Sequence, residues 1–113
     1  MVNPNLAQEI ITLQADFCSA LSDPTRLLIL YTLSDKPRNV TELASELNII
    51  QPTVSRHLKI LRERGLVQTT RTGTTITYAL FDPRLIEAID LLRAVMRDRI
   101  NYHANLIEGT TEQ

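Results

Sequence analysis

Apolar positions recur with helical spacing over most of the chain and with alternating spacing in one short stretch. Near the N-terminus they fall three and four residues apart, as on one face of an amphipathic helix. This stripe is formed by Leu6, Ile10, Leu13, Phe17 and Leu21. It predicts a helix over about residues 5–21.

A second helix should begin at Asp23-Pro24. Aspartate caps the free amides of a first turn, and proline at the first helical position has no N–H to leave unpaired. The residues that follow are apolar on nearly every side: Leu27, Leu28, Ile29, Leu30, Tyr31 and Leu33. We expect this helix, over about residues 24–34, to lie at the centre of the domain.

Two short helices follow, joined by a tight link. Asn39 and Glu42 have the spacing of a capping box, which starts the first of them. Gln51-Pro52 starts the second, and Gly65 suits the left-handed position just after its end. Such a pair is a helix-turn-helix, here over about residues 40–64.

After Gly65 the apolar spacing falls from 3.6 residues to two. Val67 and Thr69 alternate with polar residues before the glycine-containing turn Thr72–Thr75, and Ile76 and Tyr78 alternate after it. This predicts a β-hairpin over about residues 66–80. A helix-turn-helix followed directly by a hairpin is a winged helix, so we expect one mainly α-helical domain over residues 1–113 with a β-hairpin wing.

Asp82-Pro83 starts a last helix over about residues 83–107, whose apolar stripe keeps near-heptad spacing. A helix of this length would leave part of its stripe exposed on a lone domain. We therefore expect a homodimer, although packing of the stripe entirely on the chain's own first helix is the alternative. The expected interface residues are Leu6, Ile10, Leu13, Phe17, Leu92, Met96, Ile100 and His103.

Charge is distributed unevenly along a chain of net charge −1. The net charge is −3 over residues 1–35, +4 over residues 36–71 and −2 over residues 72–113. A polyanionic partner would therefore meet the middle third of the chain.

The second helix of the helix-turn-helix has two opposite faces. At 100° per residue, Val54, Leu58 and Leu61 fall together and should face the core, while Arg56 and Lys59 fall opposite. Cations, hydroxyls and an amide at the N-terminal end of such a helix suit contacts to bases and phosphates in a DNA major groove. The candidate DNA contacts here are Gln51, Thr53, Ser55, Arg56, His57 and Lys59, and those on the hairpin tip are Arg71, Thr72 and Thr74. A solvated cationic face and a merely polar turn are the corresponding structural alternatives.

These segments resemble the ArsR/SmtB family of winged-helix repressors. The resemblance covers roughly residues 6–106 and is most specific from Pro52 to Val67, with Leu21–Leu30 and Asn39–Ala44 also matching. It implies a homodimer that is built on the first and last helices, binds an inverted-repeat operator and is released by an effector. It also implies that residues matching Gln51, Thr53, Ser55, Arg56 and His57 approach DNA.

The metal-binding positions implied by the resemblance are poorly filled. The stretch Thr41–Leu47 has no thiol, and the positions of a second family site are held by Asp82, Arg84, Val95 and Asp98. A guanidinium and an isopropyl group are not zinc ligands, so neither site is expected and no cofactor is predicted. His57 is expected to be a hydrogen-bonded packing residue or a phosphate contact, with a metal ligand as the alternative. Cys18 and His103 remain as candidates for a thiol-based or redox effector site, against an inert thiol and an interfacial histidine.

Composition sets the remaining limits. With 43% hydrophobic and 22% charged residues the chain is globular, and neither a secretory signal nor a membrane span is evident, so a cytoplasmic protein without membrane contact is expected. No nucleophile, base and acid are grouped as in an enzyme. The sequence thus predicts a regulator that binds double-stranded DNA as a repressor, with an unknown effector. A winged helix that has lost DNA binding and contacts other proteins is the alternative.

Overall fold

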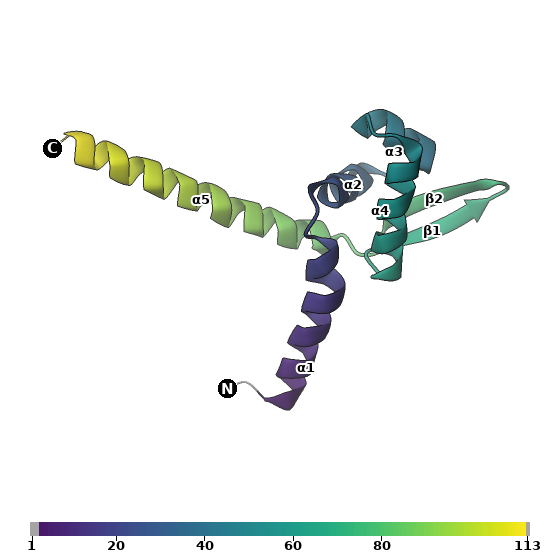
Figure 1. Cartoon of the computed structure of the whole chain (residues 1–113), viewed down its shortest axis with the longest axis horizontal. Helices are drawn as coiled ribbons and strands as arrows, with labels where there is room; N and C mark the ends of the chain where they lie inside the picture. The colour runs from purple at the N-terminus through teal and green to yellow at the C-terminus, as the bar shows by residue number, and fades with distance from the viewer. Residues whose placement is uncertain (1–2, 113) are drawn as a thin grey trace. The chain divides into compact units, whose positions relative to one another are not determined.

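The computed structural model describes residues 3–112, with side chains described as far as residue 107. It is mainly helical with one two-stranded sheet, as the winged-helix prediction requires (Figure 1). The chain divides into two compact units, Met1–Pro83 and Arg84–Gln113. The first unit holds α1, a π-helical segment, α2, α3, α4 and the hairpin, and the second is the single helix α5.

The N-terminal helix is less regular than predicted. Helix α1, Pro4–Thr12, is capped by Asn3, whose Oδ1 accepts the Leu6 N–H at 2.8 Å. It continues into a π-helix, Leu13–Cys18, where the N–H of Ser19 donates to the carbonyl of Gln14. The prediction of one regular helix over residues 5–21 is therefore wrong in this segment, because a π-helical turn is wider than a 3.6-residue turn.

Helix α2, Pro24–Asp35, begins where the sequence predicts. The Asp23 carboxylate accepts the N–H groups of Thr25 at 2.8 Å and Arg26 at 3.3 Å. Ile29, Leu30 and Leu33 are buried, but Leu28 is exposed. One side of the helix therefore lies in the core, while the side that carries Leu28 does not.

Helices α3, Val40–Leu47, and α4, Gln51–Glu63, form the helix-turn-helix. The capping box of α3 is confirmed: Asn39 and Glu42 each accept the other's backbone N–H, at 2.8 and 3.0 Å. Asn48 ends α3 in the left-handed region with φ of 54°, and Gly65 follows α4 with φ of +80°. These two residues let the chain reverse directly after each helix.

The core of the first unit is formed where α2, α3, α4 and the start of the hairpin meet. The largest fully buried side chains are Ile29, Leu30, Leu43, Val54, Leu58, Leu61 and Leu66. Each comes from an apolar position at helical spacing or from the residue next to Gly65, so burial of apolar area holds these elements together.

The wing consists of β1, Val67–Thr72, and β2, Thr75–Leu80. The strands are antiparallel, with Val67 opposite Leu80 and Thr72 opposite Thr75. The two-residue turn between them begins at Gly73, whose φ of +64° lies in the region that glycine adopts most easily. Strand β1 packs against α4, and β2 packs against α2 and α3.

Helix α5 runs from Arg84 to Glu112, five residues beyond the predicted end. Along it, large apolar side chains are exposed in the single chain; Leu92 and Met96, for example, are 67% and 49% exposed. Within residues 3–112, no helix combines the length and the hydropathy needed to cross a membrane.

Candidate nucleic-acid interface

Helix α4 carries the residues predicted to contact DNA, and its two faces differ sharply. Its inner face is fixed by Val54, Leu58 and Leu61, each 0% exposed, which confirms the predicted core positions. On the opposite face Gln51, Ser55, Arg56 and Lys59 are exposed, while Thr53 and His57 are half-buried. Because the apolar anchors fix the rotation of the helix, the polar side chains are held outward.

The N-terminal end of α4 is polar, and no side chain caps its first turn. The Gln51 amide nitrogen lies 3.4 Å from the Thr41 hydroxyl on α3, and the Arg56 guanidinium lies 3.4 Å from the Thr53 hydroxyl. These long, exposed contacts leave the amide and the guanidinium free to turn toward another acceptor. Helix N-termini also favour anions through their backbone dipoles.

A hollow of about 490 Å³ lies between the outer face of α4 and the wing. Its walls are formed by Ser55, Lys59, Arg62, Glu63 and Tyr78. Two cations and two hydroxyls beside a single carboxylate give the lining of the hollow a net positive charge. Arg62 is not among the residues predicted to contact DNA, although it lies seven residues after Ser55 and three after Lys59, on the same face of the helix. Tyr78 had no such signal, because it reaches α4 only through the tertiary fold.

His57 lies at the edge of the core, as its position on the helix predicts. Its Nδ1 is 3.3 Å from the Arg26 guanidinium, whose Nε donates to the Ala20 carbonyl at 2.6 Å. The histidine therefore links α4 to the start of α2 by a hydrogen bond. Asp23 lies in the same region. Desolvation of its carboxyl raises the pKa, but hydrogen bonds from the backbone N–H groups of Arg26 and Thr25 lower it. The nearby His57 and Arg26 side chains lower it further, so the pKa of Asp23 falls below its ordinary value of 3.8.

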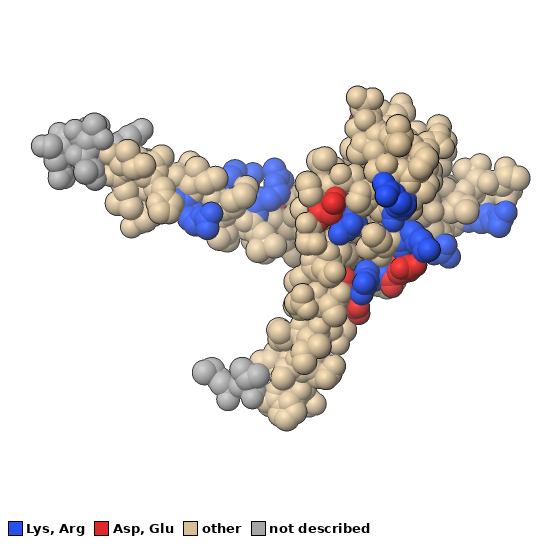
Figure 2. All heavy atoms as spheres, viewed as in Figure 1, with Lys and Arg blue, Asp and Glu red and all other residues tan. Residues whose placement is uncertain are grey.

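The wing tip presents the second group of predicted contacts. Arg71, Thr72 and Thr74 are all exposed. The Arg71 Nε lies 3.3 Å from the Gly73 carbonyl, so the guanidinium is placed at the turn. In the face shown in Figure 2, basic side chains gather over α4 and at the wing, with acidic groups beside them.

One basic residue counted in the positive middle third does not contribute to this surface. Arg38 is 6% exposed and pairs with Asp35 and Glu46. Glu46 already counts in the +4 of residues 36–71, so this pair leaves that net charge unchanged but removes one cation from the exposed surface.

The candidate effector residues lie in separate units. Cys18 is exposed at the end of the π-helix rather than beside a buried stripe. His103 lies on α5, where its ring meets that of Tyr102 edge-on with centroids 6.1 Å apart. Among the side chains that the structure describes, no three or more His, Cys, Asp and Glu residues are grouped as metal ligands would be.

The helix-turn-helix, the hairpin directly after it and the exposed polar face of α4 define the class of the protein: it is a winged helix-turn-helix regulator. The family of this chain follows from its similarity to known proteins. The family model described as "Bacterial regulatory protein, arsR family" matches residues 23–69. A probable mercury resistance operon repressor from Streptomyces lividans is 34% identical over 107 residues, which cover 87% of this chain and 86% of the relative. The chain therefore belongs to the ArsR family of transcriptional regulators, as its motifs suggest.

Other similar proteins agree with this assignment. The transcriptional regulator NmtR of Mycobacterium tuberculosis is 40% identical over 84 residues, which are 74% of this chain and 66% of NmtR. The chain thus spans slightly less than two thirds of that regulator's length. A solution structure described as a homodimeric winged helix-turn-helix DNA-binding domain from Mycobacterium bovis matches with a TM-score of 0.76 and 25% identity, over 89% of this chain and 93% of that one. NmtR is described as a transcriptional regulator, the S. lividans protein as a probable repressor and the M. bovis protein as a possible ArsR-family transcriptional regulator.

Proposed function

We propose that this chain is a homodimeric repressor that binds an inverted-repeat operator through α4 and the wing, without the metal sites found in some of its relatives. The N-terminal half of α4 reads base edges in the major groove. Arg71 and the threonines at the wing tip contact the neighbouring backbone or minor groove. Gln51, Thr53, Ser55, Arg56, His57 and Lys59 on α4, with Arg71, Thr72 and Thr74 on the wing, are the proposed contact residues.

The observation that carries this proposal is the division of α4 into an apolar inner face and an exposed polar outer face. Val54, Leu58 and Leu61 are fully buried, so Arg56 and Lys59 cannot rotate into the core. A helix held in this way presents fixed donors to a groove, which is how recognition helices discriminate between bases.

Dimerisation is supported by apolar side chains that each unit leaves exposed. Leu6, Ile10 and Leu13 are exposed at the N-terminal helix, and Leu92, Met96 and Ile100 are exposed on α5. Exposed apolar stripes of this extent are typical of interfaces. The M. bovis structure, described as homodimeric, supports the same assembly. Two symmetry-related α4 helices would enter successive major grooves about 34 Å apart, which requires a palindromic operator.

The test is selection of DNA by the purified protein, followed by titration of the selected duplex with variants. We expect the selected sequences to share an inverted repeat and Arg56→Ala to weaken binding by about 1–3 kcal/mol, roughly 5- to 150-fold, through loss of a contact to a base or phosphate. Arg71→Ala should cause a smaller loss that depends less on sequence.

Arg97→Ala is the matched control, since it removes an exposed arginine from α5. It should leave binding unchanged at fixed salt. Affinity should also fall with salt at a log–log slope of about −0.9 for each phosphate neutralised. Selection without an inverted repeat, or equal binding by wild type and Arg56→Ala, contradicts the proposal and favours a winged helix used for protein contacts.

A further inference from the structure

Arg38 is the only charged or polar residue that is buried among the described side chains, with 6% of its surface exposed. It lies in the short connection between α2 and α3, outside both helices. Burial of a guanidinium is unfavourable unless charges and hydrogen bonds surround it. Charges and hydrogen-bond acceptors should therefore surround the Arg38 guanidinium.

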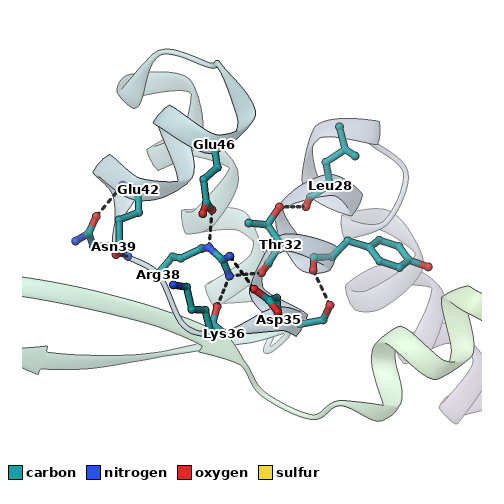
Figure 3. Close-up of polar contacts among 10 residues, drawn as sticks. Leu28, Thr32, Asp35, Lys36, Arg38, Asn39, Glu42 and Glu46 are labelled. Atoms are coloured by element: carbon teal, nitrogen blue, oxygen red, sulfur yellow. Dashed lines mark hydrogen bonds and ion pairs between the residues drawn. The ribbon is translucent and has the colours of Figure 1, made fainter.

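The Arg38 side chain joins the end of α2 to α3 (Figure 3). Its Nη1 donates to the Thr32 carbonyl at 2.5 Å and to the Lys36 carbonyl at 2.7 Å, and its Nη2 donates to Asp35 at 3.1 Å. Its Nε faces the Glu46 carboxylate of α3 at 2.5 Å. Burial alone would lower the pKa of Arg38, but hydrogen bonds to Glu46 and Asp35 outweigh it and raise that pKa. The guanidinium is thus a charged link between two helices.

The Arg38 backbone makes a different connection, to the wing. Its N–H donates to the Tyr78 carbonyl at 3.0 Å, and the Tyr78 N–H donates to the Arg38 carbonyl at 2.8 Å. This pair is an isolated antiparallel bridge beside β2. Tyr78 in turn borders the hollow next to Ser55, Lys59 and Arg62 of α4. One residue therefore connects α2, α3 and β2, the wing strand whose Tyr78 borders the hollow beside α4.

We propose that Arg38 is a positioning residue for DNA binding: its side chain holds the connection between α2 and α3 in place, and its backbone then holds β2, and with it the wing, against α2 and α3. This inference rests on the proposed function. It assigns Arg38 no contact with DNA, because its guanidinium is turned inward. Loss of the guanidinium should loosen the wing while α4 stays anchored by its own apolar side chains.

The first test measures amide hydrogen exchange by NMR in the free protein with Arg38→Met, a change to an unbranched apolar side chain. We expect the amides of residues 38 and 78 to exchange on the order of tenfold faster, because the segment they join opens more often. The Leu58 amide in α4 should keep its wild-type rate. Arg64→Met is the matched control, since Arg64 makes a surface pair with Asp16 at 3.3 Å. Unchanged exchange at residue 78 in Arg38→Met overturns the inference.

The second test is a pair of double-mutant cycles on operator binding. Arg38→Met should weaken binding on the order of fivefold and should remove most of the loss caused by Arg71→Ala at the wing tip, because residues linked through one structural element are not additive. The loss caused by Arg56→Ala should be the same with and without Arg38. If Arg38→Met reduces both losses equally or neither, its role is general stability and the inference is wrong.

Glu46→Gln keeps the test decisive if Arg38→Met does not fold. It leaves Arg38 in place and removes one of its two carboxylate partners, so exchange at residues 38 and 78 should rise by a smaller factor. No change at either amide contradicts the inference. The exchange measurement needs no DNA, so it separates this inference from the proposed function, which fails if the wild-type protein binds no duplex.

Discussion

Neighbouring side chains on α4 lie in opposite surroundings, and this decides what each substitution costs. Leu58 is fully buried, whereas Lys59 is exposed. We expect Leu58→Ala to lower the free energy of unfolding by about 2–5 kcal/mol, because it removes buried apolar surface and leaves a cavity. Urea denaturation followed by circular dichroism measures this change.

Lys59→Ala is the control for that measurement, since it truncates the next residue on the solvent side. It should change stability by no more than about 0.5 kcal/mol. A loss for Leu58→Ala as small as that for Lys59→Ala would mean that this face of α4 is not part of the core.

The roles of single residues could be predicted where they depend on local spacing. Val54, Leu58 and Leu61 were placed in the core because helical periodicity alone brings them onto one face. Arg38 was counted as surface charge, because nothing near it in the sequence reveals the distant backbone of Tyr78 or the inward turn of its side chain. Arg62 could have been found from its spacing, but the wall that Tyr78 adds to the hollow could not.

Among the elements, α2 shows how a local signal fixes a boundary. The Asp23 carboxylate accepts two backbone N–H groups in the first turn, and its pKa is lowered. A carboxyl with a lowered pKa in the folded state stabilises the fold when it is charged. This contribution is complete above its ordinary pKa near 3.8 and is lost as the pH falls through the lower folded value.

Asp23→Asn should therefore remove the contribution of this carboxyl to the pH dependence of the unfolding free energy. Asparagine still offers an oxygen to the first turn but does not titrate. We expect the difference in unfolding free energy between wild type and Asp23→Asn to be larger at pH 7 than at pH 3. Urea denaturation at the two pH values measures it, with Asp23→Ala as the variant that lacks the cap at both. An equal difference at the two pH values would show that the Asp23 charge does not stabilise α2.

The N-terminal helix contains a feature that its sequence pattern does not predict. Its apolar spacing is a local signal, and it predicts a start near residue 5, close to the observed start at Pro4. The π-helical turn over Leu13–Cys18 has no comparable signal, since no glycine or proline interrupts this segment. Contacts from outside the helix accompany it: the Arg64 guanidinium reaches the Ala15 carbonyl at 3.2 Å and Asp16 at 3.3 Å. These contacts join residues that are far apart in sequence, so periodicity could not reveal them.

At the scale of the whole molecule, the exposed apolar side chains of α5 bear on assembly. We expect the wild-type protein to be a dimer at micromolar concentration and Met96→Glu to shift it toward monomer, because a charge in an apolar interface is desolvated without a partner. Sedimentation equilibrium measures the shift. The monomer should also bind the operator more weakly, since only one half-site is then engaged at a time.

Asn105→Glu tests whether position on the helix matters rather than added negative charge. Asn105 is exposed on α5 and lies about 180° from Met96 and about 140° from Ile100 by helical spacing, so the substitution should leave the dimer intact. A monomeric wild-type protein, or equal effects of the two substitutions, would show that the apolar stripe of α5 is not the interface.

The acceptors around Arg38 also determine which nearby positions are free to vary over evolutionary time. Thr32 and Lys36 contribute only main-chain oxygens, which every amino acid supplies, so their side chains can drift without disturbing the link. Asp35 and Glu46 contribute carboxylates, and replacing either leaves an enclosed cation short of countercharge. Mutational tolerance should therefore alternate along this segment, with permissive sites interleaved between demanding ones.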